Sequence, residues 1–337
     1  MPRNYYRQIK AKKNKVKPLR TIIFSAALVA ITLFGSCAGG NNNNETSQAG
    51  NTEQAATKKI GLLMVNHGSR SETWRNALLD LEKRVTDTIM GAGKISGIKT
   101  AFMEYTEPSI ATRLKEFDAE GYTDVVIVPV FLTVSTHSFD DIPTIVGLKE
   151  DPQSMETLKI EKIERYTAKA SVHIAPLLDF TDVLQKNILR RAAALSKNAA
   201  DESLVLIAYG DHTYNTEWTD LLTKVGGYVQ EHTGIHGFAY GWCGHVASYS
   251  PDSTTVAIKR GLKDSKKAIV VPVLVAHDEM FQVKIIGDGI AKIPGSKEKV
   301  TYVADAILPD ANVQNWVVDI TGKLADKVMN GEAVAKQ

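Results

Sequence analysis

Cysteine is almost absent from this sequence, which has two cysteines, Cys37 and Cys243, among 337 residues. Two are too few for a disulfide framework or for a zinc site built from cysteine. Acidic residues are missing from residues 1–36, where eight lysines and arginines lie. The rest of the chain has 32 basic and 38 acidic residues, and this net charge of −6 excludes a strongly basic nucleic-acid-binding domain. A content of 44% hydrophobic and 23% charged residues also excludes collagen-like, coiled-coil and wholly disordered chains.

The first 36 residues have the organisation of an export signal. A basic stretch ends at Arg20, and the fourteen apolar residues 21–34 that follow are too few to span a bilayer comfortably. Two small residues precede Cys37, as in a bacterial lipobox, and this resemblance implies that the thiol of Cys37 carries a lipid. We therefore predict a lipoprotein signal peptide over residues 1–36 and an exported protein, anchored by lipid to a membrane on its periplasmic or surface side. The alternatives are a plain membrane anchor or an ordinary signal with a chance cysteine.

Residues 37–58 are small and polar and show no apolar periodicity. Such a segment buries too little apolar surface to fold, so we predict a flexible tether. If Cys37 carries a lipid, Cys243 has no cysteine to pair with, and we interpret it as a small buried apolar residue.

The body of the chain alternates between apolar strands and amphipathic helices. Residues 59–66 form a continuous apolar run that ends at His67 and precedes a helical pattern. Residues 98–105 and 124–132 are two further strands, with a helix that Pro108 opens between them. Strands that are apolar along their whole length and alternate with helices are typical of a parallel sheet covered on both faces.

The same order of strands and helices occurs twice. Residues 268–275 match residues 125–132, with Pro272 at the place of Pro129. Self-similarity of this kind indicates a duplicated domain. We therefore predict an α/β fold of two similar, flavodoxin-like lobes with parallel sheets, related by internal duplication. The predicted lobes are residues 59–200 and residues 201–337.

Polar residues follow the first three predicted strands, namely His67, Glu104 and His137. Ligands of open α/β sheets bind outside the carboxyl ends of the strands, so we expect these side chains in one cleft. Two neutral imidazoles and a carboxylate suit a divalent first-row metal ion, or the removal of a proton near neutral pH. The alternative is a structural role for each residue, as hydrogen-bonded histidines and a salt-bridged glutamate.

Three segments around these residues resemble the class II chelatases, in particular the sirohydrochlorin cobaltochelatase and ferrochelatase group. They are residues 67–70 (HGSR), 102–109 (FMEYTEPS) and 128–132 (VPVFL), the last followed by His137. The resemblance extends over about residues 59–330. It implies two chelatase-like lobes, a tetrapyrrole held between them, and a working site in the first lobe. It also implies that His67, Glu104 and His137 bind the metal ion and act in catalysis.

The resemblance further implies contacts with the carboxylates of an acidic tetrapyrrole. We expect these contacts from Arg70 and also from Ser69, Ser135 and Thr136. The alternative for Arg70 is a surface salt bridge. Glu104 is expected to balance charge and to orient an imidazole.

The second half of the chain departs from the pattern of the family. Tyr209 stands where we expect a histidine, and Tyr240 where we expect a glutamate. The residues near the third place are His277, Glu279 and Met280. We interpret this site as degenerate, with the two tyrosines and Trp242 forming either core or an aromatic wall for the macrocycle. Whether His277 and Glu279 belong to a second metal site stays open.

The resemblance implies an enzyme, a lyase that inserts a divalent ion into a tetrapyrrole such as sirohydrochlorin, in anaerobic cobalamin biosynthesis or salvage. We expect Co²⁺ as the substrate ion and no organic cofactor, but the same nitrogen and oxygen ligands also accept Fe²⁺ and Ni²⁺. The expected partners are the tetrapyrrole and, through the lipid on Cys37, a membrane. The alternative is a non-catalytic periplasmic or surface lipoprotein that binds haem, a corrinoid or a metal for uptake.

Overall fold

A computed structural model of the protein describes residues 58–332, apart from the side chain of Phe180. The predicted signal peptide, Cys37 and nearly all of the tether lie outside the described residues and stay predictions. Within residues 58–332, none of the helices combines the length and the apolar character that a membrane span requires.

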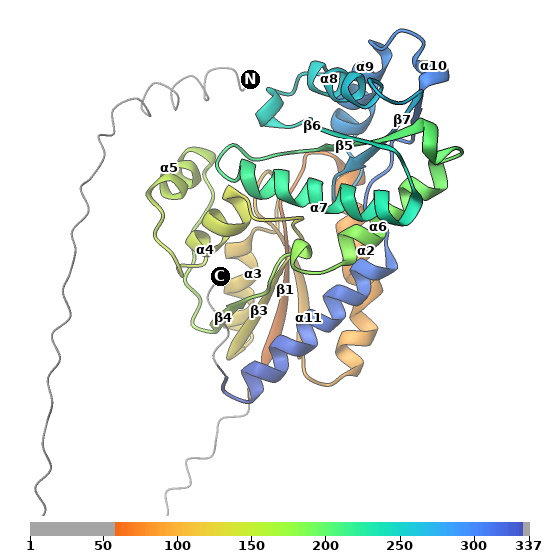
Figure 1. The fold of residues 1–337 in the computed structure, drawn as a ribbon. Helices are drawn as coiled ribbons and strands as arrows, with labels where there is room; N and C mark the ends of the chain where they lie inside the picture. The colour runs from red at the N-terminus through yellow and green to blue at the C-terminus, as the bar shows by residue number, and fades with distance from the viewer. Residues whose placement is uncertain (1–57, 333–337) are drawn as a thin grey trace, which may run out of the picture. The chain divides into compact units, whose positions relative to one another are not determined.

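The first half of the described chain is built around a parallel sheet of four strands (Figure 1). In order across the sheet, the strands are β2 (Gly97–Phe102), β1 (Ile60–Asn66), β3 (Asp124–Pro129) and β4 (Ser171–Ile174). Successive side chains of a strand point to opposite faces, so Leu62 of β1 enters one apolar cluster and Leu63 enters another. Both faces of this sheet are therefore covered, which explains why β1 and β3 are buried along their whole length.

The second half repeats this sheet. In order across it, the strands are β6 (Gly237–Trp242), β5 (Glu202–Ala208), β7 (Lys267–Val273) and β8 (Val300–Tyr302). Val65 pairs with Pro129 in the first sheet, and Ile207 pairs with Pro272 in the second. The prediction of an α/β fold with two similar lobes and parallel sheets is confirmed.

Helices fill the connections between the strands and also follow the last strand. In the first half they are α2 (Glu72–Gly91), α3 (Ile110–Ala119), α4 (Ile142–Ile145), α5 (Pro152–Glu161) and α6 (Val183–Leu195). In the second half they are α7 (Asn215–Thr233), α8 (Asp252–Gly261), α9 (Gly287–Ala291), α10 (Ser296–Lys299) and α11 (Ala311–Met329). One π-helical turn precedes α4 and another precedes α9; they are η2 (Thr136–Asp141) and η6 (Met280–Ile286).

Helix α2 shows how the local sequence fixes the segment that follows the first strand. The side chain of Ser71 accepts a hydrogen bond from the backbone N–H of Trp74 and so caps the helix. Leu78, Leu81 and Val85 recur at intervals of three and four residues and are buried. The chain between β1 and α2 is thus held between a buried strand and a capped helix.

The two halves exchange helices. Helix α6, which precedes the second sheet, packs against α7 and β7, whereas α11 returns to pack against α2 and β3 of the first sheet (Figure 1). Buried Asn187 of α6 donates hydrogen bonds to the carboxylate of Asp310 and to the carbonyl of Ile307, at the entrance to α11. One apolar cluster contains residues of both sheets. The two lobes therefore share a core.

Candidate metal centre

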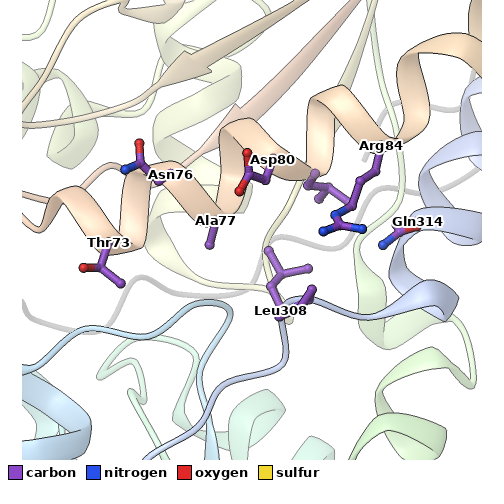
Figure 2. A pocket seen from close by; sticks show the side chains of 9 residues that line it. Thr73, Asn76, Ala77, Asp80, Arg84, Leu308 and Gln314 are labelled. Carbon is purple, nitrogen blue, oxygen red and sulfur yellow. The ribbon is translucent and has the colours of Figure 1, made fainter.

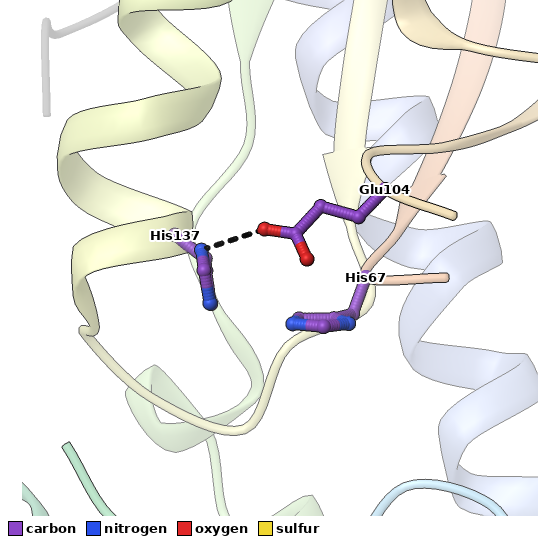
Figure 3. A group of neighbouring side chains, drawn as sticks. All are labelled: His67, Glu104 and His137. Carbon is purple, nitrogen blue, oxygen red and sulfur yellow. Dashed lines mark ion pairs between the residues drawn. The ribbon is translucent and has the colours of Figure 1, made fainter. Parts of the chain in front are cut away.

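Three side chains from the ends of neighbouring strands meet at one edge of the first sheet (Figure 3). His67 follows β1, Glu104 lies beyond the end of β2, and His137 is the second residue of η2, after β3. One ligand atom from each residue can be chosen so that all three lie within 4.8 Å of one another. We call these residues the trio. Because β1 lies between β2 and β3, all three strands deliver their carboxyl ends to this edge.

Gly68 brings His67 and Glu104 together. The backbone N–H of Glu104 donates a hydrogen bond to the carbonyl of His67 at 2.9 Å. Gly68 has a φ of +98°, and a Cβ atom at this position would lie 2.1 Å from the carbonyl oxygen of Glu104. The sequence motif therefore requires glycine here for two reasons, its positive φ and the close approach of the next loop.

Replacing Gly68 by alanine should displace the loop that carries Glu104. Strain at a positive φ alone costs of order 1–3 kcal/mol, and the contact with the Glu104 carbonyl adds to it. A matched control is Gly93→Ala, because Gly93 has a φ of +73° but a Cβ atom there would meet nothing within 4 Å. We expect Gly68→Ala to lower both the melting temperature and the affinity for Co²⁺, and Gly93→Ala to lower only the melting temperature. Equal Co²⁺ affinities in the two variants would contradict this account of Gly68.

The Nδ1 atoms of both histidines are engaged by protein groups. Nδ1 of His67 lies 2.9 Å from the carbonyl oxygen of Gly68, which can only accept, so Nδ1 carries the proton and Nε2 has the free lone pair. Nδ1 of His137 lies 2.8 Å from Oδ2 of Asp141 and 3.8 Å from Oε1 of Glu104. Carboxylates that hold the far nitrogen of an imidazole in this way are common around metal ligands. Both Nε2 atoms are therefore the nitrogens that suit a metal ion.

Asp141 contacts a candidate metal ligand, and the sequence reasoning gave it no role at the site. Its side chain is 1% exposed, and its carboxylate holds His137 from four residues further along the chain. Spacing of four residues places two side chains on the same face of a helix, so this pair was in principle visible in the sequence. The signal was hidden because nothing in the pattern predicted a helical turn over η2.

The two histidines have pKa values shifted in opposite directions. Burial, followed by the charge on His137, lowers the pKa of His67. Burial also disfavours protonated His137, but the hydrogen bond with Asp141 and the charge on Glu104 outweigh it, so the pKa of His137 is raised. His67 therefore presents a neutral imidazole near pH 7. His137 keeps its proton to a higher pH than an ordinary histidine does.

The residues expected to bind carboxylates lie around the trio in different environments. Arg70 is exposed, and its guanidinium lies 5.4 Å from the ring centre of Tyr105, which in turn lies 6.0 Å from the ring of His67. Ser69 donates a hydrogen bond to Asp278 of the second lobe at 2.9 Å. Arg70 is the one cationic residue of this group, and its side chain is exposed beside the trio.

Ser135 and Thr136 hold the turn that carries His137. The hydroxyl of buried Ser135 accepts a hydrogen bond from the backbone N–H of Ser138 and caps η2. The backbone N–H of Thr136 donates to the carboxylate of Asp211, in the second lobe, at 3.0 Å. Both residues thus contact protein groups in this structure.

The second lobe carries a degenerate copy of the site. Tyr209 follows β5 as His67 follows β1, and Gly210 has a φ of +82° like its counterpart Gly68. The backbone N–H of Gly244 donates to the carbonyl of Tyr209, which is the bond that Glu104 makes to His67. Gly244 therefore occupies the place of Glu104. The prediction that Tyr240 stands there was wrong, because β6 continues beyond this residue, which pairs with Leu206 inside the sheet.

Phe281 takes the third place of the degenerate copy. Its ring lies 5.5 Å from that of Tyr209 at 68°, much as the rings of His67 and His137 lie 4.7 Å apart at 80°. Met280, one of the residues considered for this place, is 48% exposed instead. Tyr240 and Trp242 pack against the shared apolar core. Within residues 58–332, no group of His, Cys, Asp or Glu other than the trio is gathered for a metal ion, so His277 and Glu279 form no second centre there.

A pocket of about 360 Å³ lies between α2 and the segment before α11 (Figure 2). Its lining residues are Thr73, Asn76, Ala77, Asp80, Leu81, Arg84, Leu308, Pro309 and Gln314. Its two charged residues, Asp80 and Arg84, lie on the exposed face of α2. No member of the trio lines this pocket, so it is separate from the candidate metal centre.

Comparison with known proteins identifies relatives of the first lobe. The sequence profile of the CbiX family matches residues 61–195, which include the whole trio. The sirohydrochlorin cobaltochelatase of Methanococcoides burtonii is 36% identical over 104 residues, which are 30% of this chain and 72% of the relative. The sirohydrochlorin cobaltochelatase of Methanothermobacter thermautotrophicus is 36% identical over 93 residues, which are 27% of this chain and 59% of that relative.

Solved structures match both lobes. SirB from Bacillus subtilis with Fe³⁺ aligns with a TM-score of 0.61 at 16% identity, covering 82% of this chain and 100% of its own. The sirohydrochlorin chelatase SirB from the subspecies spizizenii, in complex with cobalt, aligns over the same shares with a TM-score of 0.58 at 15% identity. At these identities the likeness shows the double-lobed α/β fold alone.

Proposed function

This chain belongs to the CbiX family of class II chelatases, and we propose that it inserts Co²⁺ into sirohydrochlorin. The observation that carries the proposal is the trio, in which two imidazoles and a carboxylate present ligand atoms within 4.8 Å of one another. Nitrogen and oxygen ligands in this combination suit divalent first-row ions. The names of the two relatives, both called sirohydrochlorin cobaltochelatases, favour Co²⁺ over Fe²⁺ and Ni²⁺.

The metal ion is a substrate in this proposal, and the trio holds it before transfer. Nε2 of His67 and Nε2 of His137 offer lone pairs, because a protein oxygen faces each Nδ1. Glu104, which is 8% exposed, supplies a negative charge that offsets part of the charge of the ion. Asp141 orients His137 and stabilises its position as a ligand. The macrocycle then has to take the ion from the three ligands of the trio, whose positions the fold already fixes.

Arg70 is the residue that we propose for recognition of the acidic macrocycle. Its guanidinium is exposed beside Tyr105, at the edge of the trio. We also propose that Ser69 and Thr136 meet substrate carboxylates, because Ser69 lies two residues after His67 and Thr136 directly precedes His137. Ser135 supports this group through its cap on η2, rather than through an open hydroxyl.

Loss of the Arg70 guanidinium should weaken substrate binding more than it slows the chemical step. Hydrogen bonds to charged groups contribute about 1.5–3 kcal/mol, and solvent screening reduces this at an exposed site. We expect Arg70→Ala to raise the KM for sirohydrochlorin by roughly three- to tenfold with kcat nearly unchanged. Arg113→Ala is the control, because Arg113 is another arginine of the first lobe whose partners, Glu116 and the carbonyl of Thr100, do not belong to the trio. An unchanged KM for Arg70→Ala would remove Arg70 from the substrate site.

A panel of metals and tetrapyrroles tests the proposed function. The full chain is mixed with Co²⁺, Fe²⁺ or Ni²⁺ and with sirohydrochlorin, a haem precursor or a corrinoid precursor, and the absorbance bands of the macrocycle are followed. We expect many turnovers per protein molecule with Co²⁺ and sirohydrochlorin. A spectral change that saturates at one equivalent would contradict catalysis and favour the binding and uptake role.

We propose export and lipid anchoring as the setting of this activity. The support is sequence alone, namely the basic stretch, the short apolar run and the small residues before Cys37, all outside the described residues. Cys37→Ser should block lipid attachment, so that the protein no longer partitions into detergent during phase separation. The control is Cys243→Ser, since Cys243 is a buried residue of the second lobe. A wild-type N-terminus without lipid in mass spectrometry would contradict the proposal.

A further inference from the structure

While the trio holds a metal ion, its two imidazoles cannot also take up the protons that insertion releases. Two pyrrole N–H bonds break as the ion enters, and each proton needs an acceptor. In both histidines of the trio a protein oxygen faces Nδ1, so Nε2 is the only lone pair for metal or proton. An imidazole nitrogen that binds a metal ion cannot bind a proton at the same time. A further base near the macrocycle would let both processes occur together.

We propose that His245 of the second lobe accepts the protons that leave the macrocycle, an inference that rests on the proposed function. His245 follows Gly244, so it occupies the place in the second lobe that Tyr105, after Glu104, occupies in the first. Tyr105 lies beside His67, and His245 correspondingly lies beside Tyr209, with 5.4 Å between the ring centres. It therefore lies at the carboxyl edge of the second sheet.

The edge that carries His245 is docked against the segment that carries His137. Asp211 follows Gly210 at the same edge, and its buried carboxylate accepts a hydrogen bond from the backbone N–H of Thr136 at 3.0 Å. Thr136 directly precedes His137. The ring of His212, the next residue after Asp211, lies 5.1 Å from the ring of His245. The second lobe thus places an imidazole near enough to the trio for the charges on His137 and His67 to act on it, although His245 is outside the group of three ligand atoms.

The electrostatic surroundings of His245 keep its imidazole unprotonated in the resting protein. Burial, with smaller contributions from the charges on His212, His137 and His67, lowers the pKa of His245 to about 4, and Asp211 acts in the opposite direction. The imidazole is therefore neutral at pH 7. Asp211 stabilises the imidazolium when it forms, and exposed His212 lies on the way to solvent.

The proposed step balances without an oxidant or a reductant. Each N–H bond breaks so that its electron pair stays on the pyrrole nitrogen and forms the bond to the metal ion. The proton passes to the unprotonated imidazole nitrogen of neutral His245 and then, through His212 or directly, to water. His245 is thereby regenerated and takes the second proton in the same way. The ion keeps its charge of +2, and two protons leave for each ion inserted.

His245→Gln in the full chain tests this assignment, with sirohydrochlorin and Co²⁺ as substrates. Loss of a general base typically lowers a rate by about 10²–10⁴-fold. We expect kcat to fall by about that factor, with the KM for sirohydrochlorin and the affinity for Co²⁺ alone nearly unchanged. Imidazole added to His245→Ala should restore part of the rate. His212→Gln should lower kcat by less than His245→Gln.

The matched control is His236→Gln, because exposed His236 directly precedes β6 at the opposite end of the strand. It should retain the activity of the wild type. An active wild type with an equally active His245→Gln would overturn the inference alone. Weaker Co²⁺ binding in His245→Gln would also overturn it, because His245 would then be a metal ligand. A wild type that turns over no metal and no tetrapyrrole would overturn the proposed function together with the inference.

Discussion

His67→Ala and His137→Ala are each expected to lower the rate of metal insertion by about 10²–10⁴-fold. This is the usual effect of removing a catalytic group that transfers a proton or binds the reacting ion. The ring centres of these residues lie 4.7 Å apart, and one ring nitrogen of each belongs to the group of ligand atoms within 4.8 Å of one another. Glu104→Ala should cost less, about 10–100-fold, if Glu104 mainly balances charge and orients an imidazole. The measurement is kcat with Co²⁺ and sirohydrochlorin for each variant.

The control for this series is His173→Ala. His173 is a half-buried histidine in β4 of the same sheet. Its ring contacts Asp124, the first residue of β3, at 2.9 Å, so it lies toward the end of the sheet opposite to the trio. It should retain its activity. Tyr209→Phe, at the counterpart of His67 in the second lobe, and Met280→Ala, at the exposed residue before Phe281, should cost far less than either histidine of the trio. Full activity in His67→Ala, with activity lost in the second-lobe variants, would show that the working site lies in the second lobe instead.

Asp141→Asn is expected to weaken Co²⁺ binding by about 10–100-fold, as is usual when the carboxylate behind a metal-binding imidazole is removed. The carboxylate of Asp141 lies 2.8 Å from Nδ1 of His137 and is almost fully buried. An asparagine keeps the size of the side chain but removes the charge. The measurement is a Co²⁺ titration followed by absorbance at several pH values.

The pH dependence of this binding follows from the opposite pKa shifts of the two histidines. Since the pKa of His67 is lowered, its imidazole is already neutral at pH 7. The pKa of His137 is raised, so His137 is protonated below that pKa and cannot bind the ion. Affinity for Co²⁺ should therefore rise as pH passes the pKa of His137 and level off above it.

Asp141→Asn should move this rise to lower pH, because the charge and hydrogen bond that raise the pKa of His137 are weakened. The plateau at high pH should nevertheless lie below that of the wild type. Asp124→Asn is the control, since Asp124 pairs with His173 at the other end of the sheet. A rise in affinity at the same pH in the wild type and in Asp141→Asn would show that His137 does not set the pH dependence.

The sheets and the meeting of the trio could be predicted because both depend on local patterns and one general rule. Runs such as those of β1 and β3 are apolar except for one end residue each, and Pro129 and Pro272 mark the same place in the two halves. Parallel neighbouring strands deliver their carboxyl ends to one edge, so residues that follow them converge even when they lie far apart in the chain.

The features that the sequence did not predict depend on contacts between distant residues or on a missing side chain. The return of α11 to the first lobe joins Lys94 to Asp326, and nothing in either local sequence indicates that contact. Gly244 has no side chain that could mark it as the counterpart of Glu104. Asp211 reaches Thr136 across the two lobes, so the role of the second lobe at the first site emerges only from the packed structure.

The most direct test of the central claim is a crystal structure of the full chain soaked with Co²⁺, with anomalous scattering recorded at the cobalt edge. We expect one strong peak within bonding distance of Nε2 of His67, Nε2 of His137 and an oxygen of Glu104. The same peak should be absent in crystals of His67→Ala. A cobalt peak bound instead by His212 and His245, with the trio empty, would contradict the assignment of the metal centre.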